Sequence, residues 1–345
     1  MKAVIHYYSA TGNTARAVGN IADRLKASGH EAAPAAIAGH SVPPDGVPEW
    51  TILAFPTWSW GMPHFVLEYV RRMPKGRGAR AGVLSVCGGF GGQAAEEAEH
   101  ALRKRGYEVV ASGEAAYPDN WTMAKGPPEG EELARTLAAG DAAARAFADD
   151  LLGEAPAKFR CGWAHKAWTK PMSRLFRRVG RRFMGKAFAA DGHCTGCGFC
   201  ETTCPVRAIR LEGVPVRPRW NASCAGCFRC INLCPERAIQ VSTARLAIHL
   251  GANLAATAAC LWGVVALRSR LPFEAAWIDW VAAAALGFAA LAGATALQLT
   301  AGDAALHWLE TRPALKGLFM RNYTGKFGRY RAPGFHPGKN SVLSR

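Results

Sequence analysis

Short apolar runs alternate with longer mixed stretches along the first part of the chain. The runs have the length of buried strands, and the stretches between them are predicted to be helices. Strands are predicted at residues 2–8, 30–37, 50–55, 79–87 and 107–117, and helices at 14–27, 63–73, 93–105 and 129–152. Strands that alternate with helices predict a doubly wound α/β domain with a parallel sheet over residues 1–153. In such a sheet, ligands bind at the carboxyl ends of the strands.

Two much longer apolar stretches lie toward the C-terminus. Residues 246–267 and 281–299 contain no charged side chain, and each is long enough to cross about 30 Å of hydrocarbon as a helix. Tryptophans stand where an interfacial aromatic belt would lie, namely Trp262, Trp277 and Trp280. We therefore expect residues 244–300 to form a transmembrane helical hairpin. The alternative is a pair of buried alanine-rich helices in a soluble domain.

The charge of the chain is unevenly distributed. The net charge is +16, but residues 1–154 hold 15 Lys+Arg against 18 Asp+Glu, whereas residues 155–345 hold 27 against 8. The basic half includes a connector (154–190) with interleaved aromatic side chains and a tail (301–345). The connector is expected either to lie on anionic lipid headgroups or to dock on the acidic first domain. Because no zinc finger, helix-turn-helix or RNA-binding signature accompanies this charge, we expect no nucleic-acid partner.

Eight of the eleven cysteines lie in two runs with the same spacing, C-x2-C-x2-C-x3-C-P. Such bunching is typical of metal ligation in a reducing compartment rather than of a disulfide framework. A zinc site would use two C-x2-C pairs, which does not explain a triplet followed by x3-C-P. The spacing predicts a small α+β domain over residues 191–243 that holds two [4Fe–4S] clusters. The ligands would be Cys194, Cys197, Cys200 and Cys204 from the first run and Cys224, Cys227, Cys230 and Cys234 from the second.

The fourth cysteine of each run is expected to ligate the other cluster, as in the two-cluster bacterial ferredoxins that this segment resembles. One cluster would then be bound by Cys194, Cys197, Cys200 and Cys234, and the other by Cys204, Cys224, Cys227 and Cys230. Crossed ligation should place the clusters close together, so that electrons could pass between them. Outside the two runs, Cys87 ends a predicted buried strand and is expected to be a small core residue.

A hydroxyl-rich loop follows the first predicted strand and opens a helix. Backbone N–H groups and hydroxyls at a helix N-terminus bind phosphate without a cation, and Gly12 lets the backbone approach closely. The loop lacks the Gly-Lys-Ser/Thr ending of a nucleotide P-loop, so ATP is not expected. Serine and threonine also serve as ordinary helix caps, which is the alternative interpretation. The candidate phosphate-binding residues are Ser9, Thr11, Gly12, Asn13 and Thr14.

The motif S-x-T-G-N-T at this place resembles the FMN phosphate loop of the flavodoxin family. The resemblance implies a flavodoxin-like sheet with strand order 2-1-3-4-5 and FMN as the cofactor. Two further loops, after the third and fourth strands, fall where flavodoxins place theirs. Their aromatic side chains would stack on the isoalloxazine ring, and their glycines would leave N–H groups free for its edge. Trp121, after the fifth strand, could close the pocket. The candidate residues for binding the flavin ring are therefore Thr57, Trp58, Trp60, Gly88, Gly89, Phe90, Gly91 and Trp121.

Two negative features narrow the expected chemistry. The third loop has no acidic residue among its glycines, unlike that of many free flavodoxins, so a very low flavin potential is not expected. No Gly-x-Gly-x-x-Gly fingerprint follows a strand, so NAD(P)H is not expected to bind and a separate redox protein must be the donor.

The order of the domains resembles that of flavodoxin–ferredoxin fusion electron carriers over residues 1–240 or so. This resemblance implies a carrier rather than a stand-alone enzyme, passing single electrons between FMN and two clusters, to or from a membrane-associated acceptor. One alternative is an FMN-dependent oxidoreductase that acts directly on a quinone or another lipophilic substrate. A redox sensor is the third hypothesis.

The charge pattern also predicts the orientation of the hairpin. No signal peptide is expected, because no charged and apolar leader with a cleavage site opens the sequence. Positive-inside reasoning puts both termini and the redox domains on the cytoplasmic side of the cytoplasmic membrane. His249 and His307 could hold a haem there, although hydrogen bonds across the hairpin are the simpler expectation.

Overall fold

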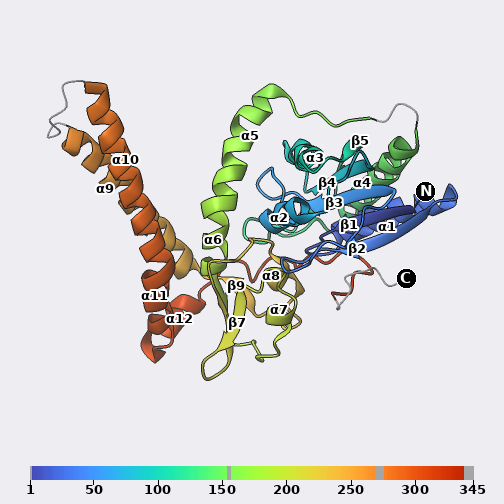
Figure 1. Ribbon diagram of the computed structural model, residues 1–345. Helices are drawn as coiled ribbons and strands as arrows, with labels where there is room; N and C mark the ends of the chain where they lie inside the picture. The colour runs from blue at the N-terminus through green and yellow to red at the C-terminus, as the bar shows by residue number, and fades with distance from the viewer. Residues whose placement is uncertain (1, 154–156, 269–275, 338–345) are drawn as a thin grey trace.

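The computed structural model describes residues 2–153, 157–268 and 276–337. The N-terminal part contains one parallel sheet with the order β2-β1-β3-β4-β5, which confirms the predicted flavodoxin-like fold (Figure 1). The strands are β1 (Lys2–Tyr7), β2 (Glu31–Ala36), β3 (Trp50–Pro56), β4 (Arg80–Cys87) and β5 (Glu108–Ala116).

Helices cover both faces of this sheet, and strand residues alternate between the two layers. Ile52 and Ala54 of β3 belong to one buried core cluster, whereas Leu53 and Phe55 point the opposite way into the other. Each cluster is covered by one pair of helices: α1 (Asn13–Ala27) with α4 (Gly130–Leu152), and α2 (His64–Arg72) with α3 (Ala94–Lys104).

The basic connector forms a long helical segment rather than an irregular linker. Its basic side chains pair with consecutive carboxylates of α3: Arg160 with Glu99 at 2.7 Å, Lys166 with Glu96 at 2.6 Å and Arg177 with Glu97 at 2.6 Å. The connector therefore docks on an acidic face of the first domain, which is one of the two expected arrangements. Its elements are α5 (Trp163–Leu175), η1 (Phe176–Gly180), α6 (Arg181–Met184) and η2 (Gly185–Ala187).

A small α+β unit carries the cysteines, and its two halves repeat the same arrangement of loop, short helix and strand. Its first strand, β6, lies within the expected connector and pairs antiparallel with β9, whereas β7 pairs with β8. The elements are β6 (Phe188–Ala190), α7 (Phe199–Thr202), β7 (Ile209–Glu212), β8 (Arg217–Trp220), α8 (Arg229–Leu233) and β9 (Ile239–Val241).

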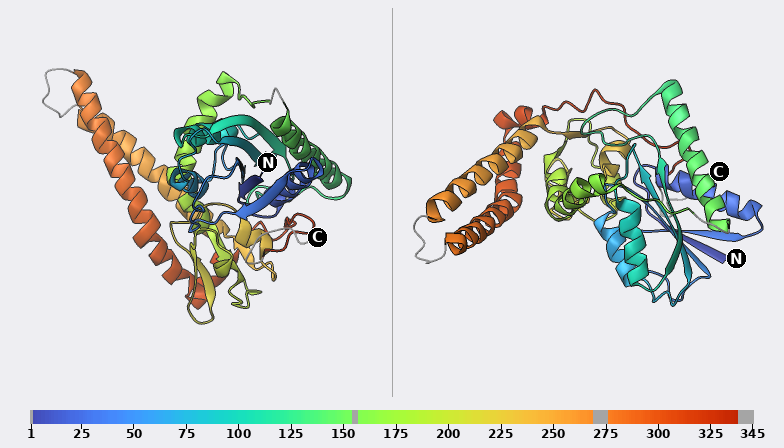
Figure 2. Two further views of the ribbon diagram at one scale, coloured as in Figure 1. Left: turned by 45° about the vertical axis from the view of Figure 1, so that its right-hand side comes forward. Right: turned by 90° about the horizontal axis from the view of Figure 1, so that it is seen from above.

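The C-terminal apolar stretches form two long helices that leave the body of the molecule as an arm (Figures 1 and 2). Both are long and apolar enough to cross a membrane, and their apolar windows are only 0% and 6% buried. Within the described residues, these helices are therefore not covered as the helices in the core of a soluble domain would be. The elements are α9 (Thr243–Arg268), α10 (Ala276–Leu297), η3 (Gln298–Gly302), α11 (Asp303–Glu310) and α12 (Pro313–Met320).

Polar side chains connect the two long helices near the body. The Gln298 amide donates to the His249 carbonyl at 2.8 Å and lies 3.2 Å from the His249 Nδ1 atom. The His307 Nδ1 atom lies 2.6 Å from Glu310. Within the described residues, His307 lines a cavity that does not include His249. The expected hydrogen bonding across the hairpin is therefore present between Gln298 and His249.

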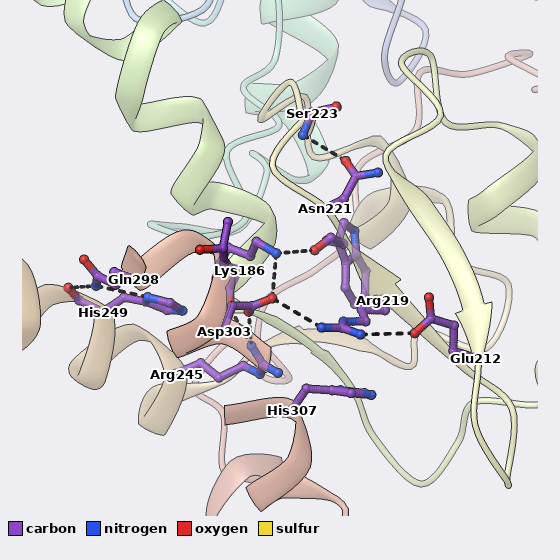
Figure 3. A network of polar contacts seen from close by, with 12 residues as sticks. Lys186, Glu212, Arg219, Asn221, Ser223, Arg245, His249, Gln298, Asp303 and His307 are labelled. Carbon is purple, nitrogen blue, oxygen red and sulfur yellow. Dashed lines mark hydrogen bonds and ion pairs between the residues drawn. The ribbon is translucent and has the colours of Figure 1, made fainter. Parts of the chain in front are cut away.

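A buried ion-pair network fixes the arm to the cysteine unit (Figure 3). The Asp303 carboxylate lies 2.6 Å from the Lys186 Nζ atom and 3.1 Å from an Arg245 guanidinium nitrogen. Arg245 also pairs with Glu310 at 2.7 Å, and Lys186 donates to the Trp220 carbonyl at 2.8 Å. Because these charges are withdrawn from water, each depends on its partners.

The Asp303→Asn variant should therefore be strongly destabilised, because it leaves Lys186 and Arg245 buried with too little opposite charge. We expect a loss of roughly 3–5 kcal/mol in the free energy of unfolding. Denaturant unfolding of the full chain in detergent measures it. The matched Glu31→Gln change breaks an exposed pair with Lys2 and should cost less than about 1 kcal/mol. Equal losses for the two variants would contradict the structural role of the network.

Candidate functional site

A cavity opens at the carboxyl ends of β1, β3 and β4, where a doubly wound sheet binds its ligand. It is formed by the three loops predicted from the sequence, together with the loop after β5. The lining residues are Ser9, Ala10, Thr11, Asn13, Thr14, Pro56, Thr57, Trp58, Val86, Cys87, Gly88, Pro118, Asp119 and Asn120.

The first loop has the backbone of an anion-binding turn. Gly12 precedes α1 with φ = +112°, and no side chain caps the helix, so its first N–H groups stay available for a ligand. The Gly12 amide donates to the Ser9 hydroxyl at 3.1 Å, and the Asn120 amide donates to the Thr11 hydroxyl at 3.0 Å. These bonds hold the loop in shape.

The second loop supplies an orphaned hydroxyl and an aromatic wall. The buried Thr57 hydroxyl has no hydrogen-bond partner within the described part of the chain. Since a buried hydroxyl without a partner is costly, this atom fits a polar ligand atom in the cavity. Trp58 lines the cavity, whereas Trp60 turns away and meets the ring of Trp168 on α5 at 4.6 Å between centroids.

The third loop is bordered by carboxylates that its own sequence does not contain. The Gly91 amide donates to Glu114 of β5 at 2.9 Å, and a Cβ atom on Gly88 would lie 2.9 Å from the Asp119 side chain. Burial raises the pKa of Glu114 above its ordinary value, which favours its neutral form. The charge beside the flavin site therefore depends partly on Glu114 of β5 and on Asp119 of the loop that follows it.

The eight cysteine sulfurs of the two runs surround two separate cavities. Cys234 lines one cavity with the first triplet, and Cys204 lines the other with the second triplet, which Cys200 also borders. We call Cys194, Cys197, Cys200 and Cys234 the outer thiol group, and Cys204, Cys224, Cys227 and Cys230 the inner thiol group. Cys197 of the outer group is exposed, whereas Cys224 and Cys230 of the inner group are buried.

Hydrogen-bond donors lie around the inner thiol group. The Ala208 amide donates to the Cys204 sulfur at 3.2 Å. Tyr8 and Trp220 are buried, and neither the Tyr8 hydroxyl nor the Trp220 Nε1 atom has a hydrogen-bond partner in the described residues. Tyr8 shares a core cluster with Cys227, and Trp220 lines the cavity of the inner thiol group together with Cys230. Orphaned donors beside these cysteines fit a negatively charged cluster, whose sulfurs would accept such bonds.

Tyr8 stands between the two sites. Its ring meets Trp58 edge-on at 5.8 Å between centroids, and Cys227 packs against the same core cluster. Burial raises the pKa of Tyr8 well above its ordinary value, so the hydroxyl keeps its proton and remains a donor. Tyr8 therefore lies between the wall of the flavin cavity and a member of the inner thiol group.

The second cysteine run is also bonded directly to the phosphate loop. Arg229, between Cys227 and Cys230, donates to the carbonyl oxygens of Ser9 at 2.9 Å and Ala10 at 3.0 Å. Because these contacts are buried and link backbone to side chain, they fix the position of one site relative to the other.

The C-terminal segment reinforces this junction. After α12 it returns to the first domain (Figure 1), where the Ala332 amide donates to the Thr11 carbonyl at 2.8 Å. The Tyr330 hydroxyl donates to the Asn13 side chain, and the Tyr330 backbone amide donates to the Asn232 side chain of α8 at 2.9 Å. The expected basic tail is therefore in part a structural strap across both sites.

The structure gathers most, but not all, of the predicted flavin residues around one cavity. Those that line it are Ser9, Thr11, Asn13, Thr14, Thr57, Trp58 and Gly88. Gly12 shapes the loop from behind, against Ala332 and Phe335. The residues outside the lining are Trp60, Gly89, Phe90, Gly91 and Trp121. Phe90 contacts His165 of α5, and Trp121 is 50% exposed.

Several residues of the site were not predicted from the sequence. Tyr8 looked like one more apolar strand residue, and Glu114 like an ordinary strand carboxylate. Asp119 and Asn120 lie in a loop of which only Trp121 was selected. Arg229 carried a usable signal, because it replaces the apolar Phe199 at the matching position of the cysteine repeat.

Comparisons with known proteins found one family model and several solved structures that are similar to parts of this chain. Residues 191–210 match the family model described as a 4Fe-4S binding domain. Among solved structures, the Streptococcus pneumonia TIGR4 flavodoxin is 17% identical (TM-score 0.32) and covers 44% of this chain and 98% of its own. The Megasphaera elsdenii flavodoxin is 16% identical (TM-score 0.29) and covers 41% and 98%. No curated protein matches the chain. The fold assignment itself rests on the observed strand order.

Substitution of Gly12 tests the phosphate loop. In Gly12→Ala the new Cβ atom would lie 2.6 Å from Ala332 and 2.7 Å from Phe335, at a φ that disfavours any L side chain. We expect FMN to bind about 5- to 150-fold more weakly, as measured by flavin fluorescence, because such strain costs about 1–3 kcal/mol. Gly29→Ala is the control, since its φ is also positive (+79°) but no atom lies within 4 Å. Equal FMN affinities in the two variants would refute the assignment.

Proposed function

We propose that this chain is a membrane-tethered electron-transfer protein that passes single electrons between FMN and two [4Fe–4S] clusters, to or from a membrane-associated partner. The 4Fe-4S match and the flavodoxin-like fold support the general function of electron transfer. The observation that carries the finer proposal is the pair of hydrogen bonds from Arg229 to the Ser9 and Ala10 carbonyl oxygens, because it joins the second cysteine run to the phosphate loop.

FMN fits the cavity of the first domain. The N-terminus of α1 and the hydroxyls of the first loop would bind its phosphate, Thr57 would bond to a polar atom, and Trp58 would face the ring. When bound, FMN supplies a centre that takes two electrons and releases them singly. The protein's part is to hold the ring beside Tyr8 and to set the local charge through Glu114 and Asp119.

Both thiol groups fit a [4Fe–4S] cluster. The family match covers only the first run, and the proposal of a second cluster is supported by the repeat of the spacing and by the crossed arrangement of the sulfurs. The inner thiol group lies beside the flavin site, whereas the outer thiol group includes the exposed Cys197. We infer that electrons pass between flavin and inner cluster, and that the outer cluster faces the protein partner.

The arm would anchor these sites in the cytoplasmic membrane. Its support is the exposure of the two apolar helices and the absence of any covering element among the described residues. The network at Asp303 then holds the cluster unit at the membrane surface. The basic connector and tail favour a cytoplasmic location for both termini and for the redox domains.

The composition of the protein tests this function directly. Anaerobic purification from solubilised membranes should yield about one FMN and about eight iron and eight sulfide ions per chain. EPR spectra of the reduced protein should show two interacting cluster signals. About four iron ions per chain would overturn the second cluster, and a zinc-containing or flavin-free preparation would overturn the proposal as a whole.

Tyr8→Phe removes a buried hydroxyl that lies beside the inner thiol group and could donate to a cluster bound there, and it leaves the ring in place. Because hydrogen bonds to sulfur stabilise the reduced cluster, the potential of the inner cluster should fall by about 20–60 mV, the equivalent of ~0.5–1.5 kcal/mol. EPR-monitored redox titration measures both clusters. Tyr69→Phe is the matched control, since the Tyr69 hydroxyl bonds to His6 at 2.9 Å, away from the sulfurs. No shift, or the same shift in both clusters, would contradict the role of Tyr8.

A further inference from the structure

A further cavity lies between the first domain and the cysteine unit, and it belongs to neither redox site. It has a volume of about 410 Å³, within the range of small-molecule sites. Its wall is assembled from the loop after β2, from α2 and α6, and from the turns that adjoin Cys204 and Cys224. The lining residues are Gly39, His40, His64, Phe65, Glu68, Arg181, Arg182, Pro205, Val206, Arg207, Ala222 and Ser223.

The charge of this lining is strongly one-sided. Three guanidinium groups, Arg181, Arg182 and Arg207, face the cavity together with two histidines, whereas Glu68 is its single carboxylate. The three arginines come from two segments that are distant in sequence, so their convergence is a product of the fold rather than of a local basic run.

The arginines are also poorly compensated by the protein. Arg181 donates to the carbonyl oxygens of Ser223 at 3.2 Å and Cys224 at 3.0 Å, which are neutral acceptors. Arg182 and Arg207 are exposed, and within the described residues they form neither a side-chain hydrogen bond nor an ion pair. Water screens these two charges, and their guanidinium groups remain available to a bound anion, which would further reduce the repulsion among the three arginines.

The surroundings of His64 point the same way. Burial, followed by the nearby arginines Arg181, Arg177 and Arg182, lowers the pKa of His64 to about 4. The imidazole is therefore neutral at physiological pH and can donate one hydrogen bond without adding charge. A neutral donor among guanidinium groups is suited to a multiply charged oxyanion.

We propose that this cavity binds the phosphate or diphosphate group of a small molecule. Guanidinium groups match phosphate oxygens in pairs, and the volume exceeds what a phosphate alone requires. Phe65, Pro205 and Val206 add an apolar wall for an organic substituent. The phosphate could be carried by a soluble metabolite or by a lipid headgroup.

If the proposed function holds, an anion in this cavity would also affect the potential of the inner cluster. The turns in its wall adjoin Cys204 and Cys224, both members of the inner thiol group. An anion there would oppose the addition of an electron to the inner cluster and lower its potential. The occupancy of the cavity would then regulate electron flow. Binding of the anion itself does not depend on this consequence.

Calorimetry on the full-length, FMN-loaded protein in detergent tests the binding, because bound FMN removes the phosphate loop as a competing site. The probes are inorganic phosphate, pyrophosphate and ADP. We expect pyrophosphate or ADP to bind with one site per chain, and the double variant Arg182→Gln, Arg207→Gln to weaken it at least tenfold. Arg210→Gln is the matched control, since Arg210 is exposed, lies outside the lining and pairs with Glu201.

A second variant is expected to strengthen anion binding, and its result does not depend on whether the double variant folds. Glu68→Gln removes the single carboxylate of the lining and should tighten binding severalfold. Flotation with phosphatidylglycerol vesicles, compared with phosphatidylcholine vesicles, tests whether the phosphate belongs to a lipid headgroup. If it does, the wild-type protein should float with the phosphatidylglycerol vesicles, and the double variant should not. Absence of binding to every probe, or equal binding by wild type and both variants, would overturn the proposal. Anion binding without iron in the preparation would refute only the redox function.

Discussion

The architecture depends on one buried contact between the two redox sites. Arg229, placed between Cys227 and Cys230, donates to the backbone of the phosphate loop, and Tyr8 packs on Trp58 in the core cluster that Cys227 also joins. A charged donor in a buried junction is stable only while its acceptors stay in place. The flavin site and the inner thiol group are therefore parts of one rigid unit, rather than two modules that meet by diffusion.

Elements distant in sequence hold that unit in position. The C-terminal strap bonds to Thr11 and Asn232, the connector is fixed to α3 by successive ion pairs, and the network at Asp303 attaches the arm. The groups around Asp303 are buried, so breaking one of their contacts leaves a partner unsatisfied. The geometry of the two proposed redox sites is thus coupled to the position of the arm.

The predictable part of this structure was the part encoded locally. Strand and helix periods gave the sheet, and the cysteine spacing gave both thiol groups, because each is a property of neighbouring residues. The connector helix was missed because its partners, the α3 carboxylates, are distant in sequence. Tyr8 could not be distinguished from other strand residues, and the aromatic Trp60 was expected at the flavin but packs on Trp168 of that unforeseen helix. Arg229 was detectable only as a break in the repeat.

Intramolecular electron transfer tests the central claim most directly. Photoreduction of the bound flavin in the full-length protein, followed by optical detection of cluster reduction, gives the rate of transfer between the two sites. A fixed contact through Tyr8 predicts a first-order rate that is independent of protein concentration and of solvent viscosity. A rate that falls as viscosity rises, or that grows with protein concentration, would show that the sites must move or meet in different molecules, and would contradict the account.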